Sequence, residues 1–217
     1  MERILEVEAM DTAEEAVAYD EMDHSEANAA FLTRLLELGV DGATLDIGVG
    51  PGHLPLLLCA ACPAVSVIGI DLSKHMLAAA ERHRSPSPFA DRIEYRLADA
   101  KGLPFSTGQF DAVYSNTILH HIPAPLPFLT EARRVLKPGG CLLIRDLFRP
   151  TSPQAADALA MLHAGQATEY QRQLFRDSLG AAFTPAELRA LADEAGLGDA
   201  ELVIDTDRHM SLQLRAN

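Results

Sequence analysis

Residues 46–52 read D-I-G-V-G-P-G, an acid followed by glycines at alternate positions, and no other segment is better suited to hold a ligand. A short apolar run precedes them, and the apolar residues 54–58 follow. Because glycine lacks a Cβ, Gly48, Gly50 and Gly52 allow a ligand to lie directly against the backbone. The segment therefore predicts a turn after Asp46 that holds a nucleotide-like cofactor at the end of a first strand.

The spacing of the glycines bears on which cofactor this is. Dinucleotide-binding turns usually have the spacing G-x-G-x-x-G, in which the third glycine comes three residues after the second. Here His53 stands at that position, and the third glycine comes one residue earlier, at Gly52. The spacing weakens the assignment to a nicotinamide dinucleotide.

Two more acids follow predicted strands. The β-branched run at residues 65–71 ends at Asp71, where a carboxylate can accept hydrogen bonds from both hydroxyls of a ribose. Leu72 comes next and could pack on an adenine face. Further along, Asp99 precedes Ala100 and could accept a hydrogen bond from an exocyclic amine. These positions favour an adenosine-containing ligand.

The remaining elements place these residues at one edge of a sheet. Apolar strands at 65–71 and 110–122 alternate with helices predicted from Ser73 to Arg84 and over 125–136, which is typical of a parallel sheet covered by helices on both faces. Residues 11–38 carry apolar positions at helical spacing and should cover the sheet edge and the cofactor mouth. The fourth strand brings Ser115 and Asn116 beside the first turn.

The second half of the chain begins with L-K-P-G-G at 136–140, which predicts a tight turn before a fifth strand. Residues 148–183 then form a mostly helical insertion, and Thr184 starts a capping box with Glu187. Strands at 200–206 and 209–214 should form an antiparallel pair.

These segments resemble the class I S-adenosylmethionine-dependent methyltransferases, in five elements that follow one another in the expected order. They are the turn at 46–52, Asp71, the pair Asp99-Ala100, the strand at 110–122 with its two histidines, and L-K-P-G-G. The resemblance runs from about Thr44 to Leu147, and within the superfamily it is greatest to the quinone-biosynthesis group. It implies an α/β, Rossmann-like, doubly wound and mostly parallel seven-stranded sheet with an antiparallel C-terminal strand and a helical lid insertion.

The resemblance predicts a single methyltransferase domain over residues 1–217. It comprises an N-terminal helical cap (1–42), a cofactor-binding core (43–147), a substrate lid (148–183) and a C-terminal helix with a strand pair (184–217).

The resemblance also implies roles in binding S-adenosylmethionine and its product S-adenosylhomocysteine. The three turn glycines would border the methionine moiety, with Asp46 holding the turn. Asp71 would bind the ribose, and Asp99 with Ala100 the adenine edge.

At the amino-acid end of the cofactor, the resemblance implies Ser115 and Asn116. Tyr19 would close over the cofactor from the N-terminal region, although it could equally be an amphipathic surface residue. Asp46 could instead only cap the backbone amides of its own turn.

A sulfonium methyl group is already electrophilic, so a base is needed only when the acceptor is protonated. His120 and His121 follow the fourth strand on the acceptor side, and either could remove a proton near neutral pH. A structural role for the pair is the alternative. The other six histidines are scattered through the sequence without metal-site spacing, so no metal is expected.

Arginines near the predicted mouth could recognise an anionic substrate. Arg145 and Arg149 follow the fifth strand and could bind a carboxylate or phosphate, together with Arg172 and Arg176 from the insertion. For Arg172 and Arg176 we favour pairing with nearby acids such as Glu169 on a solvated helix.

Composition limits the partners. The 217 residues carry 18 lysines and arginines against 31 acids, a net charge of −13, which repels polyanions and argues against a nucleic-acid substrate. No apolar run is long enough to span a bilayer, and the acidic N-terminus is unlike a secretion signal, so a cytoplasmic location is expected. Three cysteines do not suggest a disulfide framework, and the C-x-x-C at 59–62 is interpreted as packing residues. A homodimer is left open.

The sequence thus predicts a methyltransferase that acts on a small molecule. A nicotinamide-dependent oxidoreductase would share the first two strands and Asp71, but it would not explain Asp99 or L-K-P-G-G. A cofactor-binding protein without catalysis, acting through a partner, is the third possibility.

Overall fold

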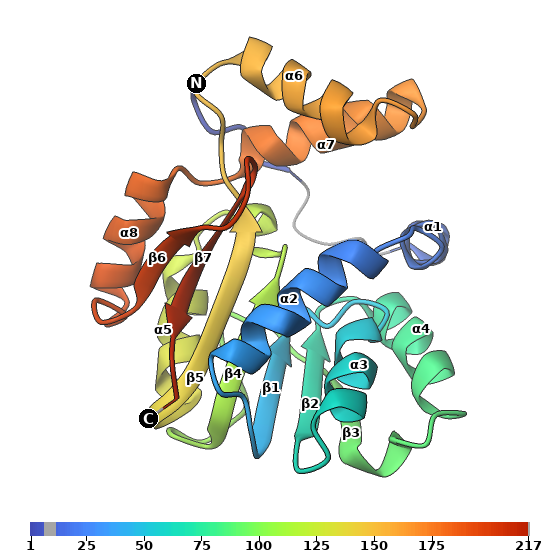
Figure 1. Cartoon of the computed structure of the whole chain (residues 1–217), viewed down its shortest axis with the longest axis vertical. Helices are drawn as coiled ribbons and strands as arrows, with labels where there is room; N and C mark the ends of the chain where they lie inside the picture. The colour runs from blue at the N-terminus through green and yellow to red at the C-terminus, as the bar shows by residue number, and fades with distance from the viewer. Residues whose placement is uncertain (7–11, 217) are drawn as a thin grey trace.

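The computed structural model describes residues 1–6 and 12–216, and one seven-stranded sheet runs through its centre (Figure 1). The strands lie in the order β3-β2-β1-β4-β5-β7-β6. Only β7 runs antiparallel to its neighbours β5 and β6. The strands are β1 Ala43–Ile47, β2 Ser66–Asp71, β3 Ile93–Leu97, β4 Phe110–Asn116, β5 Leu136–Leu147, β6 Glu201–Ile204 and β7 His209–Leu214. The predicted fold class, including the C-terminal antiparallel strand, is confirmed.

Helices cover both faces of this sheet. On one face lie α2 (Ser25–Glu37), α3 (His53–Ala61) and, beside it, α4 (Lys74–Arg84), whereas α5 (Leu126–Val135) and α8 (Pro185–Glu194) lie on the other (Figure 1). The alternation of side chains along each strand explains this arrangement. In β1, for example, Leu45 and Ile47 pack into the core under α5 and α8.

The neighbouring central strands supply the second core. Ala112 and Tyr114 of β4 pack with Phe31 and Leu35 of α2, while Val113 points to the opposite face. Both faces of the central strands are therefore buried, as a parallel sheet requires.

Local signals set several helix boundaries. The Ser73 hydroxyl accepts hydrogen bonds from the backbone N–H groups of His75 and Met76 at the start of α4. Thr184 and Glu187 form the predicted capping box of α8, with Pro185 at the first helical position. These caps satisfy N–H groups that have no partner within the helix.

The insertion forms two packed helices, α6 (Pro153–Ala164) and α7 (Glu169–Ala181), above the carboxyl ends of the parallel strands (Figure 1). The N-terminal segment lies against them: the Ile4 N–H donates to the carbonyl of Gly180. The guanidinium of Arg3 lies over the Phe183 ring, 3.8 Å from its centroid. The same guanidinium donates to the carbonyls of His120 and Ile122, at 3.0 Å each. This segment therefore ties the insertion to the end of β4.

Three sequence predictions need correction. The strand predicted over 110–122 ends at Asn116, and the two histidines lie in the short 3-10 helix η2 (Leu119–His121). The helical region predicted over 11–38 is two helices, α1 (Ala13–Asp20) and α2, because the chain turns between Asp20 and Ser25; its first residue, 11, lies outside the described residues. Residues 136–140 are not a separate turn but the irregular start of β5, whose register against β4 shifts between Phe110 and Ala112. There Gly140 is required, since a Cβ would lie 2.7 Å from the carbonyl oxygen of Asp111.

The three cysteines are free thiols, and Cys59 of α3 packs into the core. Burial raises the pKa of both Cys59 and Cys62. This environment fits packing residues and does not fit a reactive redox pair.

Candidate functional site

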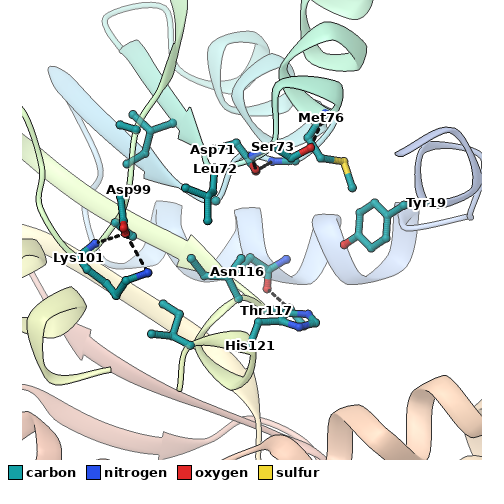
Figure 2. Close-up of a pocket in the computed structure, with 17 residues that line it drawn as sticks. Tyr19, Asp71, Leu72, Ser73, Met76, Asp99, Lys101, Asn116, Thr117 and His121 are labelled. Atoms are coloured by element: carbon teal, nitrogen blue, oxygen red, sulfur yellow. Dashed lines mark hydrogen bonds and ion pairs between the residues drawn. The ribbon is translucent and has the colours of Figure 1, made fainter. Parts of the chain in front are cut away.

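A pocket opens at the carboxyl ends of β1, β2 and β4, the place where doubly wound sheets bind ligands (Figure 2). Side chains and backbone from the glycine turn, the β2–α4 junction, the loop after β3, the end of β4, η2 (Leu119–His121) and α1 surround it. The lining residues are Tyr19, Gly48, Gly50, Ile70, Asp71, Leu72, Ser73, Met76, Ala98, Asp99, Ala100, Lys101, Asn116, Thr117, Ile118, His121 and Ile122.

The glycine turn is bound to the end of β2. The N–H groups of Gly48 and Val49 both donate to the carbonyl of Ile70, at 2.9 Å. All three glycines have positive φ angles: +75° at Gly48, +54° at Gly50 and +80° at Gly52. Such angles disfavour any residue with a Cβ, so the turn depends on glycine for its backbone shape.

The three glycines differ in what surrounds them. A Cβ at Gly48 would lie 2.5 Å from Ile118, and one at Gly52 would lie 2.4 Å from the Tyr95 hydroxyl. At Gly50 the nearest atom would be Cε1 of Tyr19, 4.0 Å away. Gly48 and Gly52 are therefore also needed for close packing, and only Gly50 leaves open space toward the ligand side. Gly52 does not line the pocket.

Asp71 lies at the centre of the pocket wall. Its Oδ2 accepts a hydrogen bond from the Gly50 N–H at 2.9 Å, and its Oδ1 accepts from the Ser73 N–H at 2.8 Å. Burial raises the pKa of this carboxyl, and the backbone donors only partly offset that effect. Because a carboxylate has about four acceptor sites, Asp71 retains acceptor capacity toward the pocket, where Leu72 follows it.

Asp46 lies beneath the glycine turn and does not line the pocket. Its side chain is 1% exposed, and its Oδ2 has no hydrogen-bond partner among the described residues. Burial, and then the charge of Asp71, raise the pKa of Asp46 well above its ordinary value. Its burial outside the pocket lining fits a residue that supports the turn from beneath, whereas the open side of Gly50 is what faces the pocket.

Asp99 and Ala100 line the pocket after β3, and Figure 2 shows Asp99 beside Lys101. The Asp99 Oδ1 accepts from the backbone N–H of Lys101 at 2.8 Å and pairs with the Lys101 Nζ at 3.1 Å. Burial alone would raise the pKa of Asp99, but the bonds from Lys101 outweigh it and lower that pKa. Asp99 is therefore ionised and held at the rim.

The two residues predicted at the end of β4, Ser115 and Asn116, point in different directions. Asn116 lines the pocket, whereas the Ser115 hydroxyl faces away and donates to the carbonyl of Ile47 at 2.8 Å. Thr117 follows with φ of +63°, a strained conformation for a β-branched residue. Its hydroxyl donates to the Asn116 side-chain oxygen at 3.1 Å and orients that amide.

Tyr19 reaches the pocket from α1, and Figure 2 shows its hydroxyl pointing toward the side chains of β2 and β4. Burial, followed by the charge of Asp71, raises the pKa of Tyr19, so the phenol is neutral and can donate a hydrogen bond.

The two histidines of η2 have different environments. His121 lines the pocket, and its Nδ1 lies 3.2 Å from Oε2 of Glu6. His120 is 2% exposed and does not line the pocket; its Nδ1 bonds Oδ1 of Asp146 at 2.6 Å. Burial alone would lower the pKa of His120, but Asp146 and Glu6 raise it above the ordinary value. Of the two histidines, His121 alone lines the pocket.

The structure does not bring Arg145 and Arg149 to the pocket. Arg149 is buried, with its guanidinium donating to the carbonyl of Ala182 at 2.8 Å and pairing with Glu187 at 2.5 Å. Arg145 is buried beside β7, with Nε 4.0 Å from Asp205. Arg145 lies in β5 and Arg149 follows it, and their side chains reach Asp205, just after β6, and Glu187 of α8.

The insertion arginines pair with acids on the surface. Arg176 pairs with Glu169 and Asp157, and Arg172 pairs with Glu169, which confirms the preferred interpretation.

Several pocket residues were not predicted from the sequence. Ser73 and Met76 enter from the first turn of α4, and Thr117, Ile118 and Ile122 from the loop after β4. The position of Ser73 and Met76 directly after Asp71 could have indicated them. The loop residues carry no local signal, because the path of the chain after β4 decides their orientation.

The comparisons agree with this geometry. Residues 45–144 match the model of a methyltransferase domain. Over 127 residues the chain is 34% identical to 27-O-demethylrifamycin SV methyltransferase of Amycolatopsis mediterranei, covering 58% of this chain and 46% of that protein. It is 31% identical over 137 residues to ubiquinone/menaquinone biosynthesis C-methyltransferase of Geotalea uraniireducens, covering 55% of this chain and 58% of the relative.

A solved structure, phosphoethanolamine N-methyltransferase 2 of Haemonchus contortus, superimposes with a TM-score of 0.69 at 24% identity, over 88% of this chain and 43% of that one. The chain spans about half the length of the curated relatives it matches. A glycine turn, a strand-two acid and a pocket at the carboxyl edge of a sheet define a Rossmann-like nucleotide-cofactor domain. Within that class, residues 45–144 match a methyltransferase domain, and the similarity to the named relatives supports the class I S-adenosylmethionine-dependent methyltransferases.

No helix within residues 1–6 and 12–216 is long and apolar enough to cross a membrane.

Proposed function

We propose that this chain transfers a methyl group from S-adenosylmethionine to a small-molecule acceptor and releases S-adenosylhomocysteine. The observation that carries the proposal is the pocket itself, where the open side of Gly50, the Asp71 carboxylate and the His121 ring line one cavity. The named relatives act on a rifamycin and on quinone precursors, and the Haemonchus contortus enzyme was solved with S-adenosylhomocysteine.

Different residues of the pocket would contact different parts of the cofactor. Asp71 would accept from the ribose hydroxyls, Leu72 and Ala100 would border the adenine, and Asp99 would lie at its rim. Asp46 would lie beneath the glycines that border the methionine end.

When bound, the cofactor supplies an electrophilic methyl group. The chain must then mainly align the acceptor, which can lower the barrier by up to about 7–11 kcal/mol. Ile118, Ile122 and Met76 offer apolar walls for this purpose, and Thr117 orients Asn116.

His121 is the candidate base. We propose that Glu6 orients its ring, because the Glu6 carboxylate lies 3.2 Å from Nδ1. His120 acts through position only: with Asp146 it forms a buried ion pair that holds η2. For an acceptor that is already a nucleophile without a proton, His121 would only shape the pocket.

We also propose that the insertion of α6 and α7 covers the acceptor side. It lies above the carboxyl ends of the strands, and α7 packs against η2, which carries His121 (Figure 1). Because Arg145 and Arg149 are committed to structural partners, we do not assign them to the acceptor.

The strongly acidic chain supports a cytoplasmic enzyme whose partner is a small molecule and which binds neither nucleic acid nor a membrane. Size-exclusion chromatography with light scattering would determine whether it is a homodimer.

The first experiment is calorimetric titration with S-adenosylhomocysteine, with NAD as the parallel control. Micromolar binding of the former alone is expected. Acceptors bearing hydroxyl, amine, thiol and activated carbon groups would then be screened for formation of S-adenosylhomocysteine. Binding of NAD alone would contradict the proposal and favour an oxidoreductase. Cofactor binding without turnover on any acceptor would favour the non-catalytic alternative.

A further inference from the structure

Asp20, His53 and His83 meet at the junction of three helices, outside the pocket. Asp20 ends α1, His53 begins α3, and His83 lies in the last turn of α4. Oδ1 of Asp20 lies 3.1 Å from Nε2 of His53 and 2.8 Å from Nε2 of His83, and the two imidazole centroids are 4.8 Å apart. Residues that are scattered in the sequence thus form one cluster.

The cluster has the composition of a transition-metal site. Two imidazoles and one carboxylate, with an open fourth position for water, are a common donor set for Zn²⁺ and similar ions. All three ligand atoms lie within 4.8 Å of one another. A tetrahedral Zn²⁺ with bonds of about 2.0–2.1 Å would separate its donors by roughly 3.3 Å. The two distances from Asp20 to the histidines, 3.1 and 2.8 Å, would therefore need to open by only a few tenths of an ångström.

The cluster can be reached from solvent. The side chains of His53, Asp20 and His83 are 31%, 15% and 36% exposed, so an ion can enter from solvent.

One cation stands nearby. The guanidinium of Arg82 lies 3.8 Å from Oδ2 of Asp20, but its side chain is 59% exposed and can swing into solvent when a metal binds. The second group of this kind, Glu6, His120 and His121, is a weaker candidate, because His120 is only 2% exposed and an ion would reach it less easily.

We propose that Asp20, His53 and His83 bind one divalent transition-metal ion of the Zn²⁺ class, which clamps α1 to α3 and α4. Tyr19 directly precedes Asp20 and lines the cofactor pocket, so the clamp holds that aromatic ring over the glycine turn. The metal is structural and regulatory, and it takes no part in methyl transfer. Its binding does not depend on the proposed function, whereas its effect on the cofactor does.

The test uses the full chain without a polyhistidine tag, freed of metal by chelation. Co²⁺ is titrated while visible ligand-field absorption is recorded, and Zn²⁺ is then added in competition. One ion per chain is expected, and His53→Asn and His83→Asn should each weaken binding at least tenfold. His163→Asn is the matched control, since it removes a histidine that pairs with Asp207 elsewhere on the surface.

Melting curves without metal show whether each variant folds, and Asp20→Asn, which keeps the shape of the side chain, provides a second test of the same site. Equal affinity of the wild type and the His53→Asn variant would overturn the proposal. Loss of binding in His121→Asn, with binding retained in His53→Asn, would also overturn it, because the metal would then lie at the other cluster.

The coupling to the pocket is measured separately. Saturating Zn²⁺ should tighten the binding of S-adenosylhomocysteine, and the ligand should tighten Zn²⁺ by the same factor. No change in either affinity would overturn the coupling. If S-adenosylhomocysteine does not bind at all, the proposed function fails while the Co²⁺ result still decides the metal site.

Discussion

Replacing Asp71 by alanine tests the assignment of the cofactor site most directly. The carboxylate is held by the N–H groups of Gly50 and Ser73 at 2.9 and 2.8 Å, so its position is set before any ligand binds. Its remaining acceptor sites would receive the ribose hydroxyls. Hydrogen bonds to a charged group contribute about 1.5–3 kcal/mol, and each 1.4 kcal/mol is tenfold in affinity. The dissociation constant for S-adenosylhomocysteine should therefore rise about 10- to 150-fold.

Asp99→Ala is the matched control, because it removes one carboxylate from the same pocket and changes the net charge equally. Asp99 lies at the rim with its side chain 47% exposed and is held by Lys101. Partly exposed pairs contribute about 1 kcal/mol or less, so its loss should raise the dissociation constant by less than about fivefold.

Calorimetric titration of both variants, with thermal melting in the absence of ligand, separates loss of contacts from loss of the turn. If Asp71→Ala leaves the dissociation constant unchanged, the ribose site is assigned wrongly. If both variants lose the same affinity, the effect is one of overall charge and the geometric argument fails.

Three other predictions concern folding and recognition. Gly48→Ala should lower the free energy of unfolding by about 2–5 kcal/mol, because a Cβ there is strained by the positive φ and collides with Ile118. Gly50→Ala should lower it by only about 1–2 kcal/mol, yet it should weaken cofactor binding. Equal losses of stability in a denaturant titration would contradict this. Asp146→Asn should destabilise most between about pH 4 and 6.5. Because the pKa of His120 is raised, its contribution to stability is complete below about pH 6.5 and is lost as pH rises through the raised pKa. Because the pKa of Asp146 is lowered, its contribution to stability is present above about pH 3.9 and is lost as pH falls through the lowered pKa. A pH-independent difference in melting temperature would refute the ion pair. Arg149→Met should lower the melting temperature without changing the acceptor KM, because Arg149 bonds Ala182 and Glu187; a raised KM with unchanged stability would return Arg149 to the substrate site.

The order of the elements and the position of the cofactor turn could be predicted because they depend on local rules. A nearly continuous apolar run predicts a strand buried on both faces, and in β1 the successive residues Leu45 and Asp46 are both buried. The capping residues Ser73 and Thr184 predict where α4 and α8 begin. The alternate glycines predict a turn with positive φ angles. None of these features needs a distant residue to define it.

The orientation of side chains at the site could not be predicted in the same way. His120 and His121 are adjacent and chemically identical, and only the position of Asp146 on β5 and of Glu6 in the N-terminal segment distinguishes a buried ion pair from a pocket-lining ring. Ser115 looked equivalent to Asn116, but alternation in β4 turns its hydroxyl to the carbonyl of Ile47.

What the sequence by itself determined is the class of fold, the edge of the sheet that binds the ligand, and the residues of the turn, since each follows from backbone propensity and alternation over a few residues. Only the tertiary structure decided that Arg149 is committed to Glu187, and that Asp20, His53 and His83 converge on one point. Those relations join residues dozens of positions apart, and their geometry depends on how whole helices pack against the sheet, which no local pattern specifies.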